Sequence, residues 1–227
     1  METHTSSSEK YNYPPIEVKV YQGNCIQMDT NQQKTHTSSA DKYIYPPIEV
    51  NLERKLKNDF RSRSKYFLVT SRFNSQTWQE NINYKMKNPK IGCIYCSPEQ
   101  ITKSIPIDSV VFVLEMNNDN NRIMGIGMIK NYSYIDKYHV YNNGNYNRYN
   151  YVGKNHILRE NMNQKELAIM EIIDKICFTG NRHMKRGQGL RSFPIDILYK
   201  CSKQGFDLVD FIRLMFKSRM ESNTIKA

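Results

Sequence analysis

Hydrophobic residues gather into three short runs in the middle of the chain. The first, Lys65–Ser71, holds four consecutive apolar residues between a basic and a polar segment. The other two, Ile107–Met116 and Ile123–Ile129, are separated by a run of asparagine and aspartate. Runs of this length that are rich in β-branched and aromatic residues predict buried strands, and the polar run predicts a hairpin turn. Gly125 and Gly127 alternate in the last run, which indicates tight curvature or a close approach of backbone.

Other segments have the spacing of helices. Ser75–Lys87 carries apolar residues every four positions, with Ser75 as a possible N-cap, and Gln164–Phe178 carries an apolar stripe that ends before a glycine. Two further helices are predicted over residues 194–202 and 206–220. A lone strand, a helix and a curled hairpin, in that order, are typical of a small barrel. We therefore expect an α+β fold: a small curled β-barrel with flanking helices and a C-terminal helical extension.

The first fifty residues contain a duplication. Residues 3–18 recur as residues 35–50, with thirteen of sixteen positions identical. Each copy holds a Ser/Thr cluster and a Pro-Pro pair, which oppose helix and central strand. The segment is therefore either a flexible tail that duplicated by accident or a two-copy docking motif, in which Tyr-x-Tyr-Pro-Pro-Ile is presented to a protein partner. Residues 51–65 follow as a basic linker or a short helix.

The formal net charge of +11 is unevenly distributed. Residues 51–65 carry six basic and two acidic side chains, and residues 179–227 carry ten basic and four acidic ones. Positive charge on both sides of the predicted core favours a polyanionic partner, nucleic acid before membrane, although a basic surface without a partner is the alternative. The predicted divisions are a tail with the basic linker (1–64), a folded domain (65–178), and a basic loop with the helical extension (179–227).

Five cysteines are present, and Cys93 and Cys96 have the spacing of zinc and redox sites. A zinc site needs four ligands, however, and a second pair at that spacing is missing. The apolar runs are shorter than a membrane span, and the N-terminus has no export signal. We therefore expect no metal, no cofactor and no membrane association. Reduced thiols in a cytoplasmic or nuclear, not secreted, protein fit this pattern.

Two segments are candidates for contacts with nucleic acid. Residues 131–151 are crowded with tyrosine and asparagine, which is typical either of a polar excursion with half-buried rings or of a stacking platform for unstacked bases. Residues 181–192 carry four cations around Gly187 and Gly189, which indicates either a solvated loop or a phosphate-binding loop. The candidate phosphate-binding residues are Lys154, Arg182, Lys185, Arg186 and Arg191.

Four short motifs, in this order along the chain, resemble those of YTH domains, which belong with the EVE domains to the PUA-like superfamily. Lys65–Ser71 (KYFLVTS) looks like their opening strand, and Ile94–Ser97 (IYCS) is similar to their I-W-C-S stretch. Val111–Leu114 followed by Met124–Met128 (MGIGM) looks like their hairpin, and His156–Asn161 (HILREN) is similar to their H-I-x-L-E-N segment. The resemblance covers residues 65–178 and implies a barrel of the PUA-like (YTH/EVE) type.

YTH domains bind N6-methyladenosine in single-stranded RNA, with the base splayed out into a cage of aromatic rings. The resemblance implies that Tyr95 takes the place of the first cage tryptophan. It also implies that the tyrosine-rich segment supplies a second wall, and that Gln76 or Asn74 contacts the adenine edge. Trp78 is alternatively a core anchor of its helix. The full set of candidate base-binding residues is Tyr95, Gln76, Asn74, Trp78, Ser97, Tyr146, Tyr149 and Tyr151.

These observations predict a non-catalytic protein that binds nucleic acid, single-stranded RNA in preference to DNA, and reads one flipped base. That base is either N6-methyladenosine or another flipped base, in RNA or DNA. The alternative is a structural or partner-recruiting protein, in which residues 3–18 and 35–50 dock a protein and the barrel is a scaffold. No Ser-His-Asp order, paired carboxylates or complete metal set indicates an enzyme. Abundant Asn, Lys, Ile and Tyr are typical of an AT-rich genome, such as that of a protist or a large DNA virus.

Overall fold

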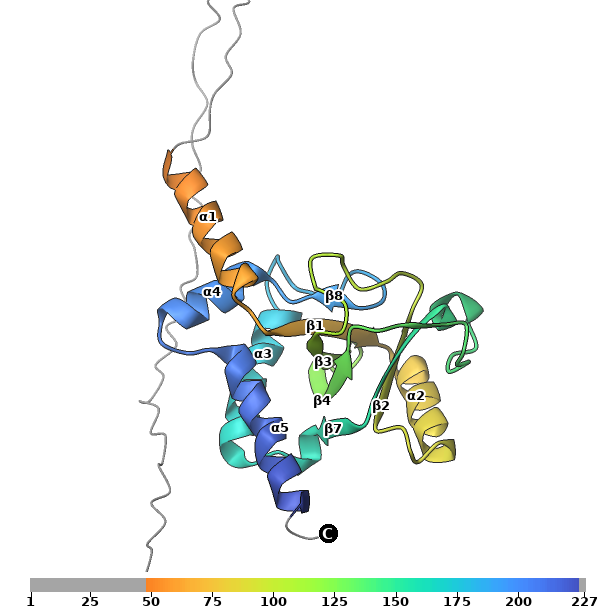
Figure 1. The fold of residues 1–227 in the computed structure, drawn as a ribbon. Helices are drawn as coiled ribbons and strands as arrows, with labels where there is room; N and C mark the ends of the chain where they lie inside the picture. The colour runs from red at the N-terminus through yellow and green to blue at the C-terminus, as the bar shows by residue number, and fades with distance from the viewer. Residues whose placement is uncertain (1–47, 225–227) are drawn as a thin grey trace, which may run out of the picture. The chain divides into compact units, whose positions relative to one another are not determined.

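Two β-sheets organise the computed structural model, in which residues 48–224 are described (Figure 1). The larger sheet has the order β7-β4-β3-β1-β8 and the smaller one the order β2-β6-β5. The strands of the larger sheet are β1 (Tyr66–Phe73), β3 (Val110–Asn117), β4 (Arg122–Lys130), β7 (Asn155–Leu158) and β8 (Arg191–Ser192). Those of the smaller sheet are β2 (Cys93–Ser97), β5 (Tyr134–Ile135) and β6 (Tyr149–Gly153). β1 and β3 pair in parallel, and the other ladders in this part of the chain are antiparallel.

The predicted α+β class is confirmed, but the strands described between residues 48 and 224 form two sheets rather than a closed barrel. The smaller sheet still approaches the larger one closely. A Cβ atom at Gly153 of β6 would lie 2.0 Å from the carbonyl oxygen of Met128 in β4, so only glycine permits this crossing. The two sheets therefore touch at β4 and β6 without sharing a ladder there.

Five α-helices and two short 3-10 turns accompany the sheets in residues 48–224. They are α1 (Ile48–Ser62), α2 (Ser75–Lys87), η1 (Gly144–Asn147), η2 (Arg159–Asn161), α3 (Gln164–Phe178), α4 (Ile195–Lys203) and α5 (Leu208–Thr224). The predicted bounds of α2 and α3 are confirmed, but the N-cap of α2 is Asn74, not Ser75. The Asn74 side chain accepts a hydrogen bond from the Thr77 amide at 2.8 Å, and the Thr77 hydroxyl accepts one from the Asn74 amide at 3.1 Å. This capping box begins the helix directly after β1.

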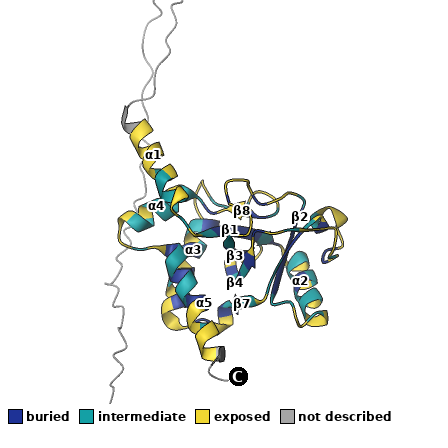
Figure 2. Cartoon of the chain, in the orientation of Figure 1, coloured by how far each residue is buried: buried dark blue, intermediate teal, exposed yellow. Residues whose placement is uncertain are grey.

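Both faces of the larger sheet are covered, which explains why its central strands are apolar throughout. Leu68 and Phe112 point to one face, where α3 and α5 pack. Val69 and Val111, their neighbours in sequence, point to the other face, toward β2 and α2. Figure 1 shows α3 and α5 on one side of β1 and α2 on the other, and Figure 2 shows the buried central strands between them.

The C-terminal residues belong to this same core. β8 pairs with β1 as an edge strand of the larger sheet. In α5, Ile212 and Phe216 are buried in the cluster that contains Phe112, and the rings of Phe112 and Phe216 stack with centroids 5.3 Å apart. The boundary predicted after residue 178 therefore does not separate two cores: residues 179–224 complete the domain.

The N-terminal duplication lies outside the described residues, apart from Ile48–Val50, which begin α1. The docking-motif interpretation stays a prediction. The basic segment at residues 51–65 is mostly helical, since α1 continues to Ser62. Within residues 48–224, no helix is both long enough and apolar enough to span a bilayer.

Candidate functional site

A polar pocket of about 440 Å³ lies where β1 ends and α2 begins. Four other parts of the chain complete it: the end of β2, the β3–β4 turn, the tyrosine-rich excursion and the glycine-containing loop. Its lining residues are Ser71, Arg72, Phe73, Asn74, Gln76, Thr77, Glu80, Cys96, Asn118, Tyr141, Asn143, Tyr146, Gly187, Gln188 and Gly189. The pocket thus combines amides, two tyrosine rings, one carboxylate and one guanidinium, which suits a ligand with a flat ring and polar edges.

Two buried asparagines hold the tyrosine-rich wall of the pocket. The Asn147 side chain accepts from the amides of Val140 and Tyr141, each at 3.0 Å, and donates to the Tyr141 carbonyl at 2.7 Å. The Asn150 side chain accepts from the amides of residues 137 and 138 and donates to the carbonyls of residues 138 and 147. These bonds replace the ladder that an irregular segment lacks. The wall is therefore fixed in place by the fold.

The opposite wall is the glycine loop, which we define as residues 181–190. Side chains from the larger sheet and its turn bind this loop. The Nε of Arg72 donates to the carbonyl of Met184, and the Nδ2 of Asn118 donates to the carbonyl of Lys185 at 3.1 Å. Gly189 has a φ of +64°, and a Cβ there would lie 2.0 Å from the Ser97 hydroxyl, so the loop requires glycine at this position.

Arg72 gives the loop side of the pocket its charge. No ion pair of Arg72 occurs among residues 48–224, whereas Arg159 pairs with Asp174 at 2.7 Å and Arg219 pairs with Glu166 at 2.7 Å. Burial, together with the nearby charge of Arg191, lowers the pKa of Arg72 from its usual value. A guanidinium that is partly buried, beside another cation and without a carboxylate, attracts an anion.

An acidic group lies on the other side of the pocket. Glu80 of α2 accepts hydrogen bonds from Gln76 at 3.0 Å and from Asn142 at 2.8 Å. The N-terminus of α2 is itself already neutralised, because the Asp119 carboxylate accepts from both the amide and the hydroxyl of Ser75. An anionic group in the pocket is therefore favoured near Arg72 and disfavoured near α2.

Three of the predicted base-binding residues line the polar pocket, namely Asn74, Gln76 and Tyr146. The prediction for Tyr95 is wrong, because its ring is fully buried and its hydroxyl donates to Glu115 at 2.8 Å. Side chains alternate along a strand, so the neighbouring Cys96 lines the pocket instead. Gly127 leaves room for the tyrosine: a Cβ there would lie 1.9 Å from the Tyr95 hydroxyl oxygen.

The other predicted base contacts also lie elsewhere. Tyr151 is buried, and its hydroxyl accepts a hydrogen bond from the Ile101 amide at 2.9 Å. Ser97 is buried beneath Gly189. Trp78 packs edge-on against Phe73, with ring centroids 5.2 Å apart, and lines a separate pocket of about 650 Å³ beside α2. The core interpretation of Trp78 is therefore the one that its packing supports.

An aromatic surface lies on the same excursion of the chain that carries Tyr146. Tyr132 is 54% exposed, Tyr134 is 37% exposed, and their ring centroids are 5.4 Å apart. The ammonium of Lys137 lies 4.5 Å from the centroid of the Tyr134 ring and 5.4 Å from that of Tyr138. Tyr149, one of the predicted base contacts, is half-buried here beneath the guanidinium of Arg148. We call this group the tyrosine surface.

The predicted phosphate-binding residues do not form one cluster. Arg182 and Arg186 are exposed on the glycine loop, and the Lys185 ammonium donates to Asn121 at 2.8 Å. Arg191, in β8, forms an exposed ion pair with Glu99 at 3.2 Å. Lys154 is exposed in the turn that joins β6 of the smaller sheet to β7 of the larger one, and it is distant from the glycine loop in sequence.

Sequence reasoning missed Arg72, Asn118, Tyr141 and Cys96 as lining residues. Arg72 carried a usable signal, since it is a cation inside an otherwise buried strand whose burial pattern it interrupts. Asn118 had none, because an asparagine in a predicted turn needs no further explanation. Tyr141 was one of many tyrosines in its segment, and only its position over α2 distinguishes it.

The cysteine pair is part of the core of the smaller sheet. Burial raises the pKa of both the Cys93 and the Cys96 thiol to about 12, which opposes formation of the thiolate that metal binding and redox exchange require. Cys177 is buried as well. Among residues 48–224 no three His, Cys, Asp or Glu side chains are placed to hold a metal ion.

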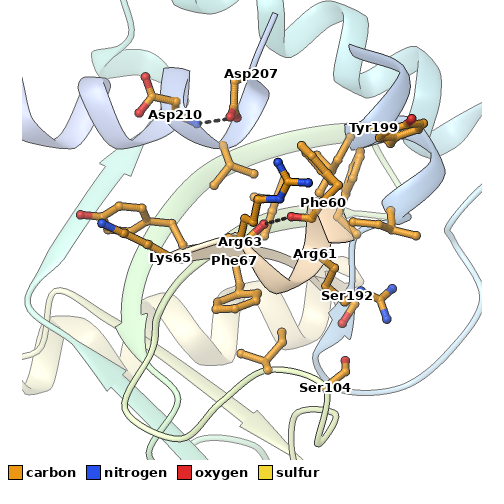
Figure 3. A pocket seen from close by; sticks show the side chains of 18 of the residues that line it. Phe60, Arg61, Arg63, Lys65, Phe67, Ser104, Ser192, Tyr199, Asp207 and Asp210 are labelled. Atoms are coloured by element: carbon orange, nitrogen blue, oxygen red, sulfur yellow. Dashed lines mark hydrogen bonds between the residues drawn. The ribbon is translucent and has the colours of Figure 1, made fainter. Parts of the chain in front are cut away.

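A third pocket, of about 400 Å³, lies between α1, β1, α4 and α5 (Figure 3). Apolar side chains such as Phe60 and Phe67 line it, and its rim carries both cations and carboxylates. Figure 3 shows the cations Arg61 and Arg63 and the carboxylates Asp207 and Asp210 among the side chains that line it. Charge does not separate this groove from the polar pocket, since both carry cations and carboxylates. What distinguishes the polar pocket is its amides and the three predicted base-binding residues that line it.

No protein-family model, curated protein or solved structure matches this chain. The resemblance to YTH domains therefore depends on its short motifs.

Proposed function

We propose that this protein binds single-stranded nucleic acid, RNA in preference to DNA, and holds one unstacked base in the polar pocket. The observation that carries the proposal is the convergence of Asn74, Gln76 and Tyr146 in one pocket next to a cationic loop. Amides supply both donors and acceptors for a base edge, and a tyrosine ring supplies a stacking face. In this proposal the fold is of the PUA-like type, with its barrel opened into two sheets.

The tyrosine surface extends the site beyond one base. Exposed rings at Tyr132 and Tyr134 offer faces on which neighbouring bases stack, and Lys137 and Arg148 lie over rings where a phosphate can reach them. Asp136 lies between Tyr134 and Lys137 in the sequence, and its carboxylate would repel the phosphates of a bound nucleic-acid strand. The net charge of +11 adds a long-range attraction to any polyanion.

A methyl group on the bound base tests which base the pocket prefers. A methyl buried against the rings of Tyr141 and Tyr146 adds about 0.8 kcal/mol, which is a preference of roughly fourfold. The resemblance implied that Tyr95 contacts the methylated base, but Tyr95 does not line the pocket. In this proposal Tyr141 and Tyr146 contact the base instead.

The test is fluorescence anisotropy on a short single-stranded RNA that carries one adenosine or one N6-methyladenosine. Tyr146→Ala is expected to weaken binding by about 5- to 150-fold, because one stacked base contributes about 1–3 kcal/mol. Gln76→Ala is expected to weaken it by about tenfold. Gln79→Ala is the matched control, since Gln79 is on the same helix and donates to Asn83 at 2.9 Å, but does not line the pocket.

Equal losses in Gln76→Ala and Gln79→Ala would contradict a base in the polar pocket. Binding by wild type that does not weaken between low and moderate salt would contradict nucleic-acid binding itself, because each neutralised phosphate releases counterions.

A further inference from the structure

Two buried polar atoms of the polar pocket have no hydrogen-bond partner among residues 48–224. They are the Nη1 of Arg72 and the Oδ1 of Asn118. The same side chains bind adjacent carbonyls of the glycine loop, at Met184 and Lys185, through their other nitrogen atoms. One half of each side chain therefore holds the loop, and the other half has no partner among these residues.

Such atoms are rare in folded proteins, because a buried donor or acceptor without a partner costs about 1–3 kcal/mol. Arg159 and the buried Asn81 also have an atom of this kind, but neither lines the polar pocket, and the charge of Arg159 is balanced by Asp174. Arg72 and Asn118, by contrast, both line one cavity, and they carry a free donor on a cation and a free acceptor on an amide. Both atoms are closed from solvent, so a ligand in the cavity contacts them after a local rearrangement of the side chains.

The two atoms specify complementary chemistry. The Nη1 of Arg72 donates, and its charge favours an anionic oxygen. The Oδ1 of Asn118 only accepts, so it requires a hydroxyl or an N–H group. A phosphodiester has no proton to donate at neutral pH, so the phosphate that suits Arg72 does not satisfy Asn118. The sugar next to the phosphate does, because a ribose hydroxyl is a donor.

The charges of the pocket orient such a ligand. Glu80, on the α2 side, already accepts hydrogen bonds from Gln76 and Asn142. Its negative charge opposes a phosphate there and suits the N–H groups of a base. Gly187, on the loop side, lies close to the guanidinium: a Cβ there would be 3.8 Å from the Cζ of Arg72. The φ of +110° at Gly187 favours glycine at this position.

We propose that the polar pocket is a ribonucleotide site, in which Arg72 binds the phosphate, Asn118 binds a ribose hydroxyl, and the base lies toward Glu80 and Gln76. This inference rests on the proposed function, since it identifies what the same pocket recognises. It also gives a reason for a preference for RNA over DNA, because a 2′-deoxyribose lacks the 2′-hydroxyl, one of the groups that can donate a hydrogen bond to Asn118.

Isothermal titration with mononucleotides tests the site in the full-length protein. The probes are the four nucleoside 5′-monophosphates, the four nucleosides, and the four 2′-deoxynucleoside 5′-monophosphates. For wild type, we expect at least one 5′-monophosphate to bind about tenfold more tightly than its nucleoside, and more tightly than its deoxy form. Arg72→Gln should remove the phosphate effect while its amide still reaches the Met184 carbonyl. Asn118→Ala should remove the ribose effect alone.

Two control variants separate ligand contacts from general effects. Arg54→Gln removes the same charge from an exposed position of α1 that does not line the pocket. Asn121→Gly removes another tether of the glycine loop, the bond from Lys185, and keeps the positive φ that this position requires. Neither should change the ratio of nucleotide to nucleoside affinity.

Equal affinity of wild type for nucleosides and their monophosphates would overturn the inference, as would an unchanged ratio in Arg72→Gln. A single-stranded RNA that binds tightly while no mononucleotide binds would also overturn it, and would leave the proposed function standing on the tyrosine surface. Failure of the RNA itself to bind would remove the proposed function and this inference together. Binding of free mononucleotides but not of strands that contain them would uphold the ribonucleotide site and contradict the proposed function.

Discussion

Two polar groups lie against the larger sheet, and they differ in how completely they are satisfied. Glu115 of β3 is fully buried, accepts from Tyr95 at 2.8 Å, and lies 2.9 Å from the Nε2 of His156. Arg72 of β1, on the neighbouring strand, has one bonded nitrogen and one without a partner among the described residues. The hydrogen bonds of the first group are completed by the protein itself, whereas those of the second are left incomplete in a side chain that lines a pocket.

This difference separates a structural role from a binding role. A buried charge whose hydrogen bonds are complete holds β2, β3 and β7 together, and removing it leaves its partners unsatisfied. A partly buried charge that the fold leaves incomplete costs stability and gains a partner only when a ligand arrives. Mutations in the two groups should therefore have opposite signatures: loss of stability in the first, and loss of binding in the second.

The largest effect is expected for Glu115→Ala. The substitution leaves the Tyr95 hydroxyl and His156 buried without their partner, and breaking a buried pair in this way costs about 3–5 kcal/mol. Urea unfolding followed by circular dichroism measures the change. A loss of less than about 1 kcal/mol in the free energy of unfolding would contradict a structural role for Glu115 and its two partners.

A smaller loss is expected for Gly127→Ala. The added methyl would lie 1.9 Å from the hydroxyl oxygen of Tyr95, so the tyrosine must move and its bond to Glu115 must lengthen. Overpacking of this kind costs about 1–3 kcal/mol. Gly144→Ala is the control, because nothing lies within 4 Å of a Cβ at that position. Equal thermal midpoints for the two variants would contradict the close packing of Tyr95.

The pH dependence of stability sharpens the same comparison. Burial opposes ionisation of Glu115, but the charge and the hydrogen bond of His156 outweigh it and hold the pKa of Glu115 below its usual range. The unfolded chain then binds a proton more readily than the folded one. Stability contributed by Glu115 is therefore present above the unfolded pKa, about 4.3, and is lost as pH falls through the folded pKa.

Unfolding free energies measured from pH 7 downward should fall more steeply below that range in wild type than in Glu115→Gln. Identical pH profiles for the two proteins would exclude the Glu115 carboxylate as a source of acid sensitivity.

The smallest change in stability is expected for Arg72→Gln. The substitution removes a partly buried charge with an unpartnered nitrogen and keeps a donor for the loop, so the unfolding free energy should change by less than about 1 kcal/mol. Differential scanning calorimetry without ligand provides the measurement. A loss as large as that in Glu115→Ala would show that Arg72 stabilises the fold as Glu115 does, and the two side chains would then not differ in role.

Much of the secondary structure was predictable because it depends on local patterns. The apolar runs that form β1, β3 and β4 and the stripes that form α2 and α3 follow from side-chain periodicity. The C-terminal boundary was misplaced for a non-local reason: β8 is two residues long and pairs with β1, more than a hundred residues away in the chain. No local signal marks a strand of that length.

The candidate site was predictable in part. Asn74 and Gln76 were found because they follow β1 directly, and Tyr146 because it lies in an aromatic segment. Tyr95 was assigned to the wrong face, since a residue and its neighbour in a strand point to opposite sides and the sequence does not say which side faces the core. The alternation of Gly125 and Gly127 predicts curvature or a close approach of backbone. A Cβ at Gly125 would lie 2.9 Å from the carbonyl oxygen of Ile157, which is such an approach, and 2.6 Å from the Glu115 carboxylate, while one at Gly127 would meet the Tyr95 hydroxyl.

The sequence by itself determined the α+β class, the strand and helix segments, and the presence of cations around two glycines. Only the tertiary structure decided that Arg72 and Asn118 meet these glycines in one pocket, while Tyr95 and Glu115 close on each other in the core. The physical reason is that hydrogen-bond satisfaction is a property of a site assembled from distant segments. Residue type shows which groups need a partner, and the fold shows which of them the protein leaves without one.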